Sequence, residues 1–275
     1  MSDLASSLAV TKPPEPAREW TGPRIAGHII LGLWFLIGLG LLAYMVRAWN
    51  PDLFTRYAPQ YISGLGVTLT LVSISIVIGA VLSVPIAYAR MSSNRFLAAL
   101  AYAYVYFFRG TPLLAQTFLI YYGLGSFRPA LESVGLWIFF REAWYCAIFA
   151  FSLNTAAYQA EILRGAIESV ERGQWEGAAS LGVSKWITLR KIILPQALIV
   201  GLRPYGNEII LMIKGSAIVA IITVFDLMGE TRRAYSRSFD FQTYLWAAIL
   251  YLTIVEMLRH TIDWIERIIT RHLVR

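Results

Sequence analysis

The sequence predicts an all-α, polytopic membrane protein. Of its 275 residues, 57% are hydrophobic and only 15% are charged, whereas soluble domains carry about 25% charged residues. A soluble core of this size cannot bury that much apolar surface, so the composition excludes a cytosolic globular enzyme and a disordered chain. The second observation is a series of six apolar stretches, each long enough to cross a hydrocarbon core about 30 Å thick.

The first apolar stretch predicts a membrane span over residues 26–47. It follows a polar tail, residues 1–25, which we expect to be disordered and cytoplasmic. A cleaved signal peptide is the alternative, but the tail is long and no clear small-residue cleavage site follows the apolar run. Five further stretches cover residues 64–89, 96–124, 144–163, 196–224 and 244–262.

The third stretch predicts a broken helix. A continuous helix over residues 96–124 would reach about 43 Å, which exceeds the hydrocarbon thickness. Pro112 removes a backbone donor and biases Thr111 away from helical angles, so we expect the break at Arg109-Gly110-Thr111-Pro112. The freed carbonyls need partners. Arg109 either satisfies these carbonyls or meets a substrate carboxylate.

The distribution of Lys and Arg predicts the topology. With six spans and a cytoplasmic N-terminus, the inside segments hold twice as many Lys and Arg residues as the outside segments. This excess places both termini, including a basic tail over residues 266–275, in the cytoplasm. The arginines near Arg232 fall outside and run against the trend. A five-span topology would instead leave the N-terminal tail outside.

The segment over residues 165–195 is too long and too regular for an ordinary connection. Trp175, Ala178, Ala179 and Gly182 recur at helical spacing and predict a short helix with a small-residue face. Gly182 is suited to end that helix, and Ser184 to cap the next one. Such a face fits a groove on another protein, although a helix at the lipid headgroups, anchored by Trp175, has the same pattern.

This segment resembles a known motif. Glu176-Gly177-Ala178, followed after three residues by Gly182 and after nine more by Ile192-x-Leu194-Pro195, is similar to the EAA loop of bacterial ABC importer permeases, with Gly177 in place of an alanine. Further segments resemble the polar amino acid permeases of the histidine, arginine, ornithine and opine type, the M-type inner-membrane subunit in particular. These are Phe108–Leu114, Ser152–Tyr158, Glu161–Ile162 and Arg164–Ile167.

The resemblance covers residues 60–265 and implies a five-span permease domain, so residues 26–47 form an extra N-terminal span. It also implies that Trp175, Glu176, Gly177, Ala178, Ala179 and Gly182 couple the chain to an ATPase. The implied partners are an ABC ATPase dimer, a periplasmic amino-acid-binding protein and a second homologous permease in a heterodimer. The implied location is the bacterial inner membrane, and no nucleic acid is involved.

The implied function is the permease subunit of an ATP-driven importer for a polar amino acid or opine. Two acidic candidate positions in the spans against one basic position favour a basic substrate. The chain has no phosphate-binding loop, so we expect no cofactor on it and ATP with Mg on the partner ATPase. One cysteine and three scattered histidines assemble no metal site, and no catalytic group is recognisable. An ion-coupled secondary amino acid transporter is the alternative function.

Polar groups inside spans are costly and often functional. We expect some of them to line the substrate path: Arg109, Asn154, Thr155, Tyr158, Glu161, Asn207 and Glu208. Asn154, Tyr158 and Glu161 share one helical face. Glu161 or Glu208 would hold a substrate ammonium. The alternatives are an anchoring role for Glu161 toward the coupling loop and pairing of Arg203 with Asn207 or Glu208.

Overall fold

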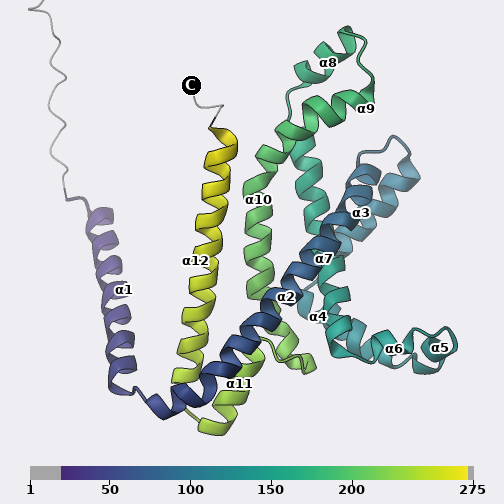
Figure 1. Ribbon diagram of the computed structural model, residues 1–275. Helices are drawn as coiled ribbons and strands as arrows, with labels where there is room; N and C mark the ends of the chain where they lie inside the picture. Colours follow the sequence, from purple (N-terminus) through teal and green to yellow (C-terminus); the bar gives the residue numbers. More distant parts are fainter. Residues whose placement is uncertain (1–19, 272–275) are drawn as a thin grey trace, which may run out of the picture. The chain divides into compact units, whose positions relative to one another are not determined.

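The computed structural model describes residues 20–271, which form helices joined by turns (Figure 1). The all-α prediction is confirmed for this part of the chain. The chain divides into two units, Met1–Asn50 and Pro51–Arg275.

The described part of the first unit is a single long helix, α1 (Gly22–Arg47). It is apolar on all sides and buries none of its residues, as expected of a helix whose solvent is lipid. The helix matches the predicted first span. It begins at Gly22, so residues 22–25, assigned to the polar tail, are helical. Residues 1–19 of that tail and residues 272–275 of the basic tail lie outside the described residues.

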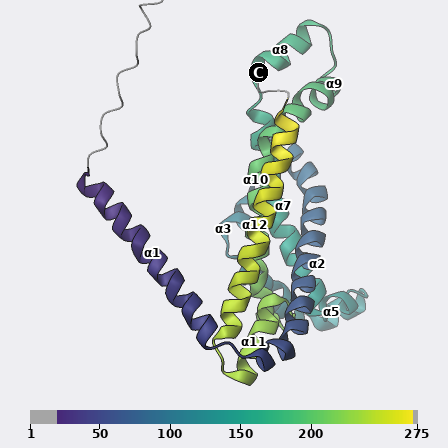
Figure 2. The same cartoon turned by 60° about the vertical axis from the view of Figure 1, so that its left-hand side comes forward.

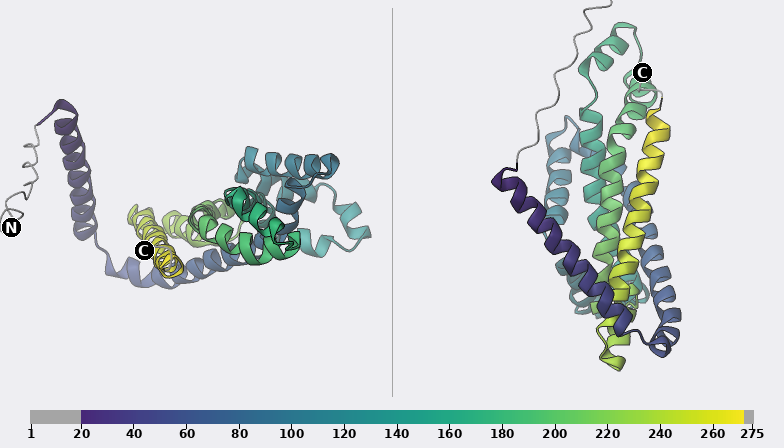
Figure 3. Two further views of the ribbon diagram at one scale, coloured as in Figure 1. Left: turned by 90° about the horizontal axis from the view of Figure 1, so that it is seen from above. Right: turned by 90° about the vertical axis from the view of Figure 1, so that its left-hand side faces the viewer.

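The second unit is a helical bundle (Figures 2 and 3). Short π-helical turns (η1, η2) and a 3₁₀ segment (η3) continue three of its helices. Its elements in chain order are α2 (Pro51–Arg90), α3 (Arg95–Gly110), α4 (Leu113–Phe118), η1 (Leu119–Gly123), α5 (Arg128–Ser133), α6 (Trp137–Phe140), α7 (Ala143–Glu168), α8 (Arg172–Ser180), α9 (Lys185–Thr188), η2 (Leu189–Ile193), α10 (Leu194–Gly215), η3 (Ser216–Ile222), α11 (Leu227–Ser238) and α12 (Gln242–Thr270).

Packing of α2 against α7 is the most extensive helix contact of this unit. Small residues of α7 allow the close approach, since Ala147, Ala150 and Ala156 are fully buried. On α2, Gly79 faces α7 so closely that a Cβ atom there would lie 2.5 Å from Thr155 Cγ2 and 2.9 Å from Gln159 Nε2. The bundle therefore depends on a glycine at this point.

We expect Gly79→Val to destabilise the bundle by about 2 kcal/mol, because the added side chain must push Thr155 and Gln159 out of place. Gly66→Val on the same helix is the matched control, since nothing lies within 4 Å of a Cβ at Gly66. Thermal unfolding of the purified protein in detergent measures both variants. Equal melting temperatures for the two would contradict this account of the α2–α7 contact.

The structure supports the predicted spans unevenly. Among the described residues, four helical segments are long and apolar enough to cross a membrane: Gly22–Arg47, Pro51–Arg90, Lys185–Ile222 and Gln242–Thr270. The third predicted stretch is helical on both sides of a break, because α3 ends at Gly110 and α4 begins at Leu113. The fourth corresponds to α7, which is long but carries many buried polar groups. The total of six spans stays a prediction.

Helix α11 begins at a well-formed cap. Asp226 is its N-cap residue and accepts a hydrogen bond from the Gly229 N–H at 2.8 Å. The carboxyl group is fully buried, and Thr68 Oγ1 on α2 accepts the next backbone N–H, from Leu227, at 3.1 Å. Asp226 lies outside the predicted spans. Burial raises the pKa of the Asp226 carboxyl to about 6, and the hydrogen bond from Gly229 opposes that rise.

The raised pKa predicts a pH-dependent stability. A carboxyl group whose pKa is higher in the folded protein than the ordinary 3.8 stabilises the fold below that value, and this contribution is lost as the pH rises through about 6. Asp226→Asn keeps an acceptor for Gly229 and cannot ionise. We expect the variant to melt above the wild type at pH 7–8 and to lose that advantage near pH 4. A pH-independent difference would contradict the assignment.

Candidate functional site

The segment between α7 and α10 forms a helical hairpin at one end of the bundle (Figure 1). Helix α8 (Arg172–Ser180) leads to a turn, and α9 follows from Ser184. Gly182 has a φ of +70°. The N–H of Val183 donates to the Ala178 carbonyl and that of Gly182 to the Ala179 carbonyl, each at 3.0 Å, which is the Schellman arrangement at a helix end. The predicted stop at Gly182 is confirmed, and Ser184 occupies the predicted N-cap position of α9, although its side chain makes no capping hydrogen bond.

Helix α8 is oriented so that two residues of the predicted docking face, Trp175 and Ala178, turn toward the bundle. Trp175 packs against an apolar cluster, and Ala178 is buried at 4% exposure. The cluster contains residues of α7, of the turn that follows it, of η2 and of α10: Ala166, Ile167, Val170, Ile193 and Ala197. Ala178 is therefore buried in the bundle, and Trp175, which is half-buried, attaches α8 to it, because an aromatic and a small apolar side chain are stabilised by burial.

The outward face of α8 is made of other residues. Glu176, Gly177, Ala179 and Gly182 are exposed, as the docking prediction requires. Gly173 and Ser180, which the sequence analysis did not select, are also exposed, and one helical turn separates each from Gly177. Leu181 is 83% exposed and Trp186 of α9 is 68% exposed. The hairpin thus presents a small-residue surface beside two large apolar side chains.

The predicted helix break is confirmed, but its carbonyls are satisfied by unexpected residues. Thr111 has extended angles between α3 and α4. The freed carbonyl of Phe108 accepts from Asn154 Nδ2 at 3.0 Å and from Gln116 Nε2 at 2.9 Å. Gln116 Nε2 also donates to the Thr111 carbonyl at 3.1 Å. Buried amides rather than Arg109 therefore hold the break, which corrects one of the two roles proposed for that arginine.

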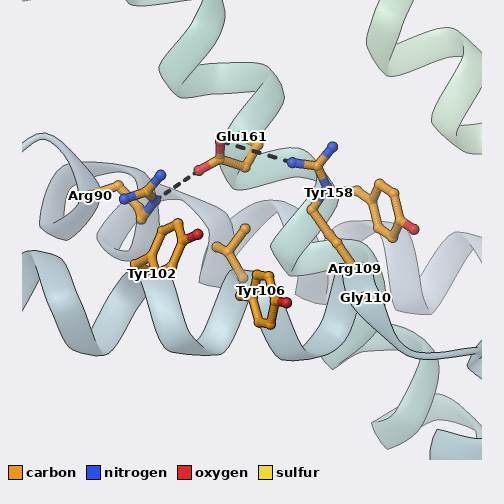
Figure 4. Close-up of a pocket in the computed structure, with 8 residues that line it drawn as sticks. Arg90, Tyr102, Tyr106, Arg109, Gly110, Tyr158 and Glu161 are labelled. Carbon is orange, nitrogen blue, oxygen red and sulfur yellow. Dashed lines mark hydrogen bonds and ion pairs between the residues drawn. The ribbon is translucent and has the colours of Figure 1, made fainter.

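Arg109 instead faces a charged cleft between α2, α3 and α7 (Figure 4). Its Nη1 lies 3.9 Å from Glu161 Oε2, and its guanidinium group lies over the Tyr158 ring at 5.2 Å. The cleft has a volume of about 370 Å³. Eight residues line it: Arg90, Tyr102, Val105, Tyr106, Arg109, Gly110, Tyr158 and Glu161.

Glu161 is the centre of this cluster. Arg90 Nε donates to its Oε1 at 2.9 Å and Arg164 Nη2 to its Oε2 at 2.8 Å. Arg164 also forms an ion pair with Glu168, which lies one turn further along α7 toward the hairpin of α8 and α9. Because three guanidinium groups surround one carboxylate, Glu161 joins the ends of α2 and α3 to α7. This arrangement favours the anchoring role over capture of a substrate ammonium.

A second polar network lies inside the bundle, between α7 and α10. Thr155 Oγ1 donates to Glu208 Oε1 at 2.8 Å, and Gln159 Nε2 donates to Thr155 Oγ1 at 3.0 Å. The Tyr205 hydroxyl donates to Gln159 Oε1 at 3.0 Å. Glu208 is 4% exposed. Side chains that donate and accept hydrogen bonds among themselves join α7 and α10 here. Two of them, Gln159 and Tyr205, are not among the predicted site residues.

The one remaining candidate, Asn207, and its suggested partner Arg203 take no part in these clusters. Asn207 is exposed and lies beside Glu208 in the chain without sharing its network. Arg203 pairs with neither of them, because its Nε donates to Glu266 Oε2 on α12 at 2.8 Å. The predicted pairing of Arg203 with Asn207 or Glu208 is wrong. Sequence spacing selects partners on the same helix, whereas the bundle brings α12 beside α10.

The sequence also matches a known protein family. Residues 75–275 match the model of the binding-protein-dependent transport system inner membrane component. The chain belongs to this family. The permease is 46% identical over 197 residues to the nopaline transport system permease protein NocM of Agrobacterium fabrum, covering 71% of this chain and 82% of NocM.

Another relative and one solved structure agree with this assignment, and a second solved structure shares the fold. The permease is 37% identical over 212 residues to the arginine ABC transporter permease protein ArtM of Escherichia coli, covering 77% of this chain and 95% of ArtM. A crystal structure of an amino acid ABC transporter with histidines matches 78% of the permease and 96% of its own chain, at a TM-score of 0.70 and 35% identity. The MetNI methionine ABC transporter shares the fold, at a TM-score of 0.60 and 20% identity.

The protein is therefore a non-catalytic, multi-pass inner-membrane subunit of an ABC transporter, and the ATPase is a separate subunit. The family assignment favours this function over the ion-coupled secondary transporter. Within residues 20–271, no group of three or more His, Cys, Asp and Glu side chains is placed to hold a metal ion.

Proposed function

We propose that this permease imports a basic amino acid or an opine in an ATP-driven transporter. The names of its relatives support that substrate class, since they specify nopaline, octopine and arginine. The observation that carries the coupling mechanism is the exposed α8 surface at Glu176, Gly177, Ala179 and Gly182. A projecting helix with small side chains permits close approach of a partner backbone.

The proposed assembly contains a second homologous permease, an ABC ATPase dimer and an extracytoplasmic binding protein. The hairpin of α8 and α9 then lies in the cytoplasm, as do both termini. ATP and Mg bind to the ATPase dimer, and this chain holds neither. Closure of the ATPase dimer around ATP would move α8, and the apolar cluster around Trp175 would transmit the movement to α7 and α10.

The charged cleft is the proposed segment of the substrate path. Arg109 and Tyr158 line it, and a guanidinium group over an aromatic ring is well placed to receive a carboxylate. Glu161 positions Arg109 and anchors the cleft to the coupling hairpin through Arg164. Asn154, Thr155 and Glu208 stabilise the bundle around the path, since each is engaged with buried partners.

Reconstitution tests the proposed function directly. The permease, purified with its associated subunits and placed in proteoliposomes, is expected to take up radiolabelled arginine or octopine only when ATP and the binding protein are both present. ATP without the binding protein, or an ion gradient without ATP, should give no uptake. Uptake by this chain alone under an ion gradient would contradict the proposal.

A further inference from the structure

The outer face of α11 carries charged residues that have no role in the coupling mechanism. Leu227, Glu230, Thr231 and Ala234 are buried, and α11 packs against α2 and α12. Arg232, Arg233, Ser236 and Arg237 are exposed on the other side of the helix. Helix α11 therefore presents three arginines away from the bundle, and we call Arg232, Arg233, Ser236 and Arg237 the arginine face.

The acidic residues of the same segment do not neutralise this face. Asp226 is fully buried and Glu230 is 8% exposed. Arg233 Nη1 lies 3.5 Å from Glu230 Oε1. Among the described residues, Arg232 and Arg237 take part in no ion pair within 4.0 Å. Residues 226–240 carry three acidic and three basic side chains, but two of the acids are buried and the third, Asp240, is half-buried, so the exposed surface is mainly positive.

A cleft of about 530 Å³ opens beside Arg232 and Arg233. Phe225, Tyr235 and Tyr244 contribute rings to its lining, and the Arg233 guanidinium group lies 5.3 Å from the centre of the Phe225 ring. Phe225 is 52% exposed. Arginine beside tyrosine and phenylalanine is the composition of protein-binding hot spots, and a planar guanidinium group pairs with a carboxylate through two hydrogen bonds.

The position of α11 indicates on which side the partner lies. Helices α8 and α11 lie at opposite ends of the bundle formed by residues 51–275 (Figures 1 and 2). If α8 is cytoplasmic, as the proposed function requires, α11 is extracytoplasmic. Three arginines in a short outer segment oppose the usual excess of positive charge inside. That departure indicates a role outside the membrane.

We propose that the arginine face and its cleft dock an acidic loop of the extracytoplasmic binding protein. An Asp or Glu side chain of that loop enters the cleft beside Phe225 and pairs with Arg232 and Arg233, while Arg237 attracts further negative charge. This inference rests on the proposed function. A protein carboxylate is favoured over a lipid phosphate because the arginines border a concave, aromatic cleft and α11 packs at the end of α2 and α12.

The test uses the complete transporter in phosphatidylcholine proteoliposomes, titrated with the binding protein of the same system while ATPase activity is recorded. We expect Arg232→Glu with Arg237→Glu to raise the half-maximal binding-protein concentration at least roughly tenfold. The ATPase rate without binding protein and the maximal rate should stay unchanged. Raising the salt concentration should weaken stimulation of the wild type more than that of the variant.

Two controls make the result decisive. Arg128→Glu with Arg141→Glu places the same charge change on exposed arginines of the predicted outer segment that contains α5 and α6, and we expect no shift. If double charge reversal on α11 reduces assembly, Arg232→Gln and Arg237→Gln should each give a smaller shift in the same direction.

Three outcomes have distinct meanings. An unchanged half-maximal concentration in the α11 variant would overturn the docking proposal while leaving the permease function intact. A defect that occurs only when phosphatidylglycerol is added to the vesicles would overturn it in favour of lipid binding. Absence of stimulation in the wild type would instead contradict the proposed function itself.

Discussion

Gly177→Glu is expected to abolish ATP-driven uptake while leaving the isolated permease folded. Gly177 is exposed and nothing lies within 4 Å of a Cβ at this position, so the bundle tolerates the side chain. In the assembled transporter the carboxylate would be buried against the ATPase without a partner. Such a charge costs about 3 kcal/mol, which corresponds to roughly 100-fold weaker association. Co-purification of the ATPase and uptake in proteoliposomes measure the two effects.

Two variants control for charge and for the loss of glycine. Ser93→Glu adds the same charge to an exposed position in the predicted cytoplasmic turn between α2 and α3, and should leave uptake unchanged. Gly177→Ala should retain most uptake because the surface stays small. Normal ATPase stimulation in Gly177→Glu would show that the partner does not approach this face of α8.

Glu161→Gln is expected to have the largest effect among substitutions in the charged cleft. The amide leaves Arg90, Arg109 and Arg164 without their shared counter-charge at a site that is only 13% exposed. Loss of the shared carboxylate from a half-buried cluster costs about 2 kcal/mol, between the values for an exposed and a fully buried ion pair. We expect a lower melting temperature in detergent, together with loss of both uptake and ATPase stimulation.

An exposed ion pair serves as the control for this result. Glu132→Gln removes the partner of Arg128 on α5, where both side chains are largely exposed, and should change stability by less than about 1 kcal/mol. If Glu161 contacts substrate and does not anchor the helices, Glu161→Gln would raise the substrate KM while the melting temperature and the maximal ATPase rate stay at wild-type values. That combination would contradict the anchoring role.

Much of the fold follows from local rules that operate within one segment. Apolar stretches predict where the helices lie, Pro112 predicts the break, and Gly182 predicts the end of α8. Each of these depends on backbone geometry or on burial of a continuous segment. Such signals can be recognised in the sequence without knowledge of tertiary contacts. The structure confirms the break and the helix end that they predict.

The partners of side chains follow from tertiary packing and were harder to predict. Helical spacing grouped Trp175 and Ala178 with the exposed residues of α8, but packing of α8 on its own bundle turns both inward. The break after Arg109 needs donors, yet only the packing of α7 beside α3 and α4 shows that Asn154 and Gln116 supply them. A polar residue four positions after Pro112 in an apolar stretch is the signal in the sequence that could have pointed to Gln116.

Cysteine accessibility on α8 tests the coupling mechanism most directly. The chain has a single cysteine, Cys146, which is buried, so Gly177→Cys in a Cys146→Ala background carries one reactive thiol. We predict rapid labelling by a membrane-impermeant maleimide in inside-out vesicles containing the permease alone, and strong protection once the ATPase subunits are assembled. Equal labelling in the two states would contradict the proposal that the ATPase binds the exposed face of α8.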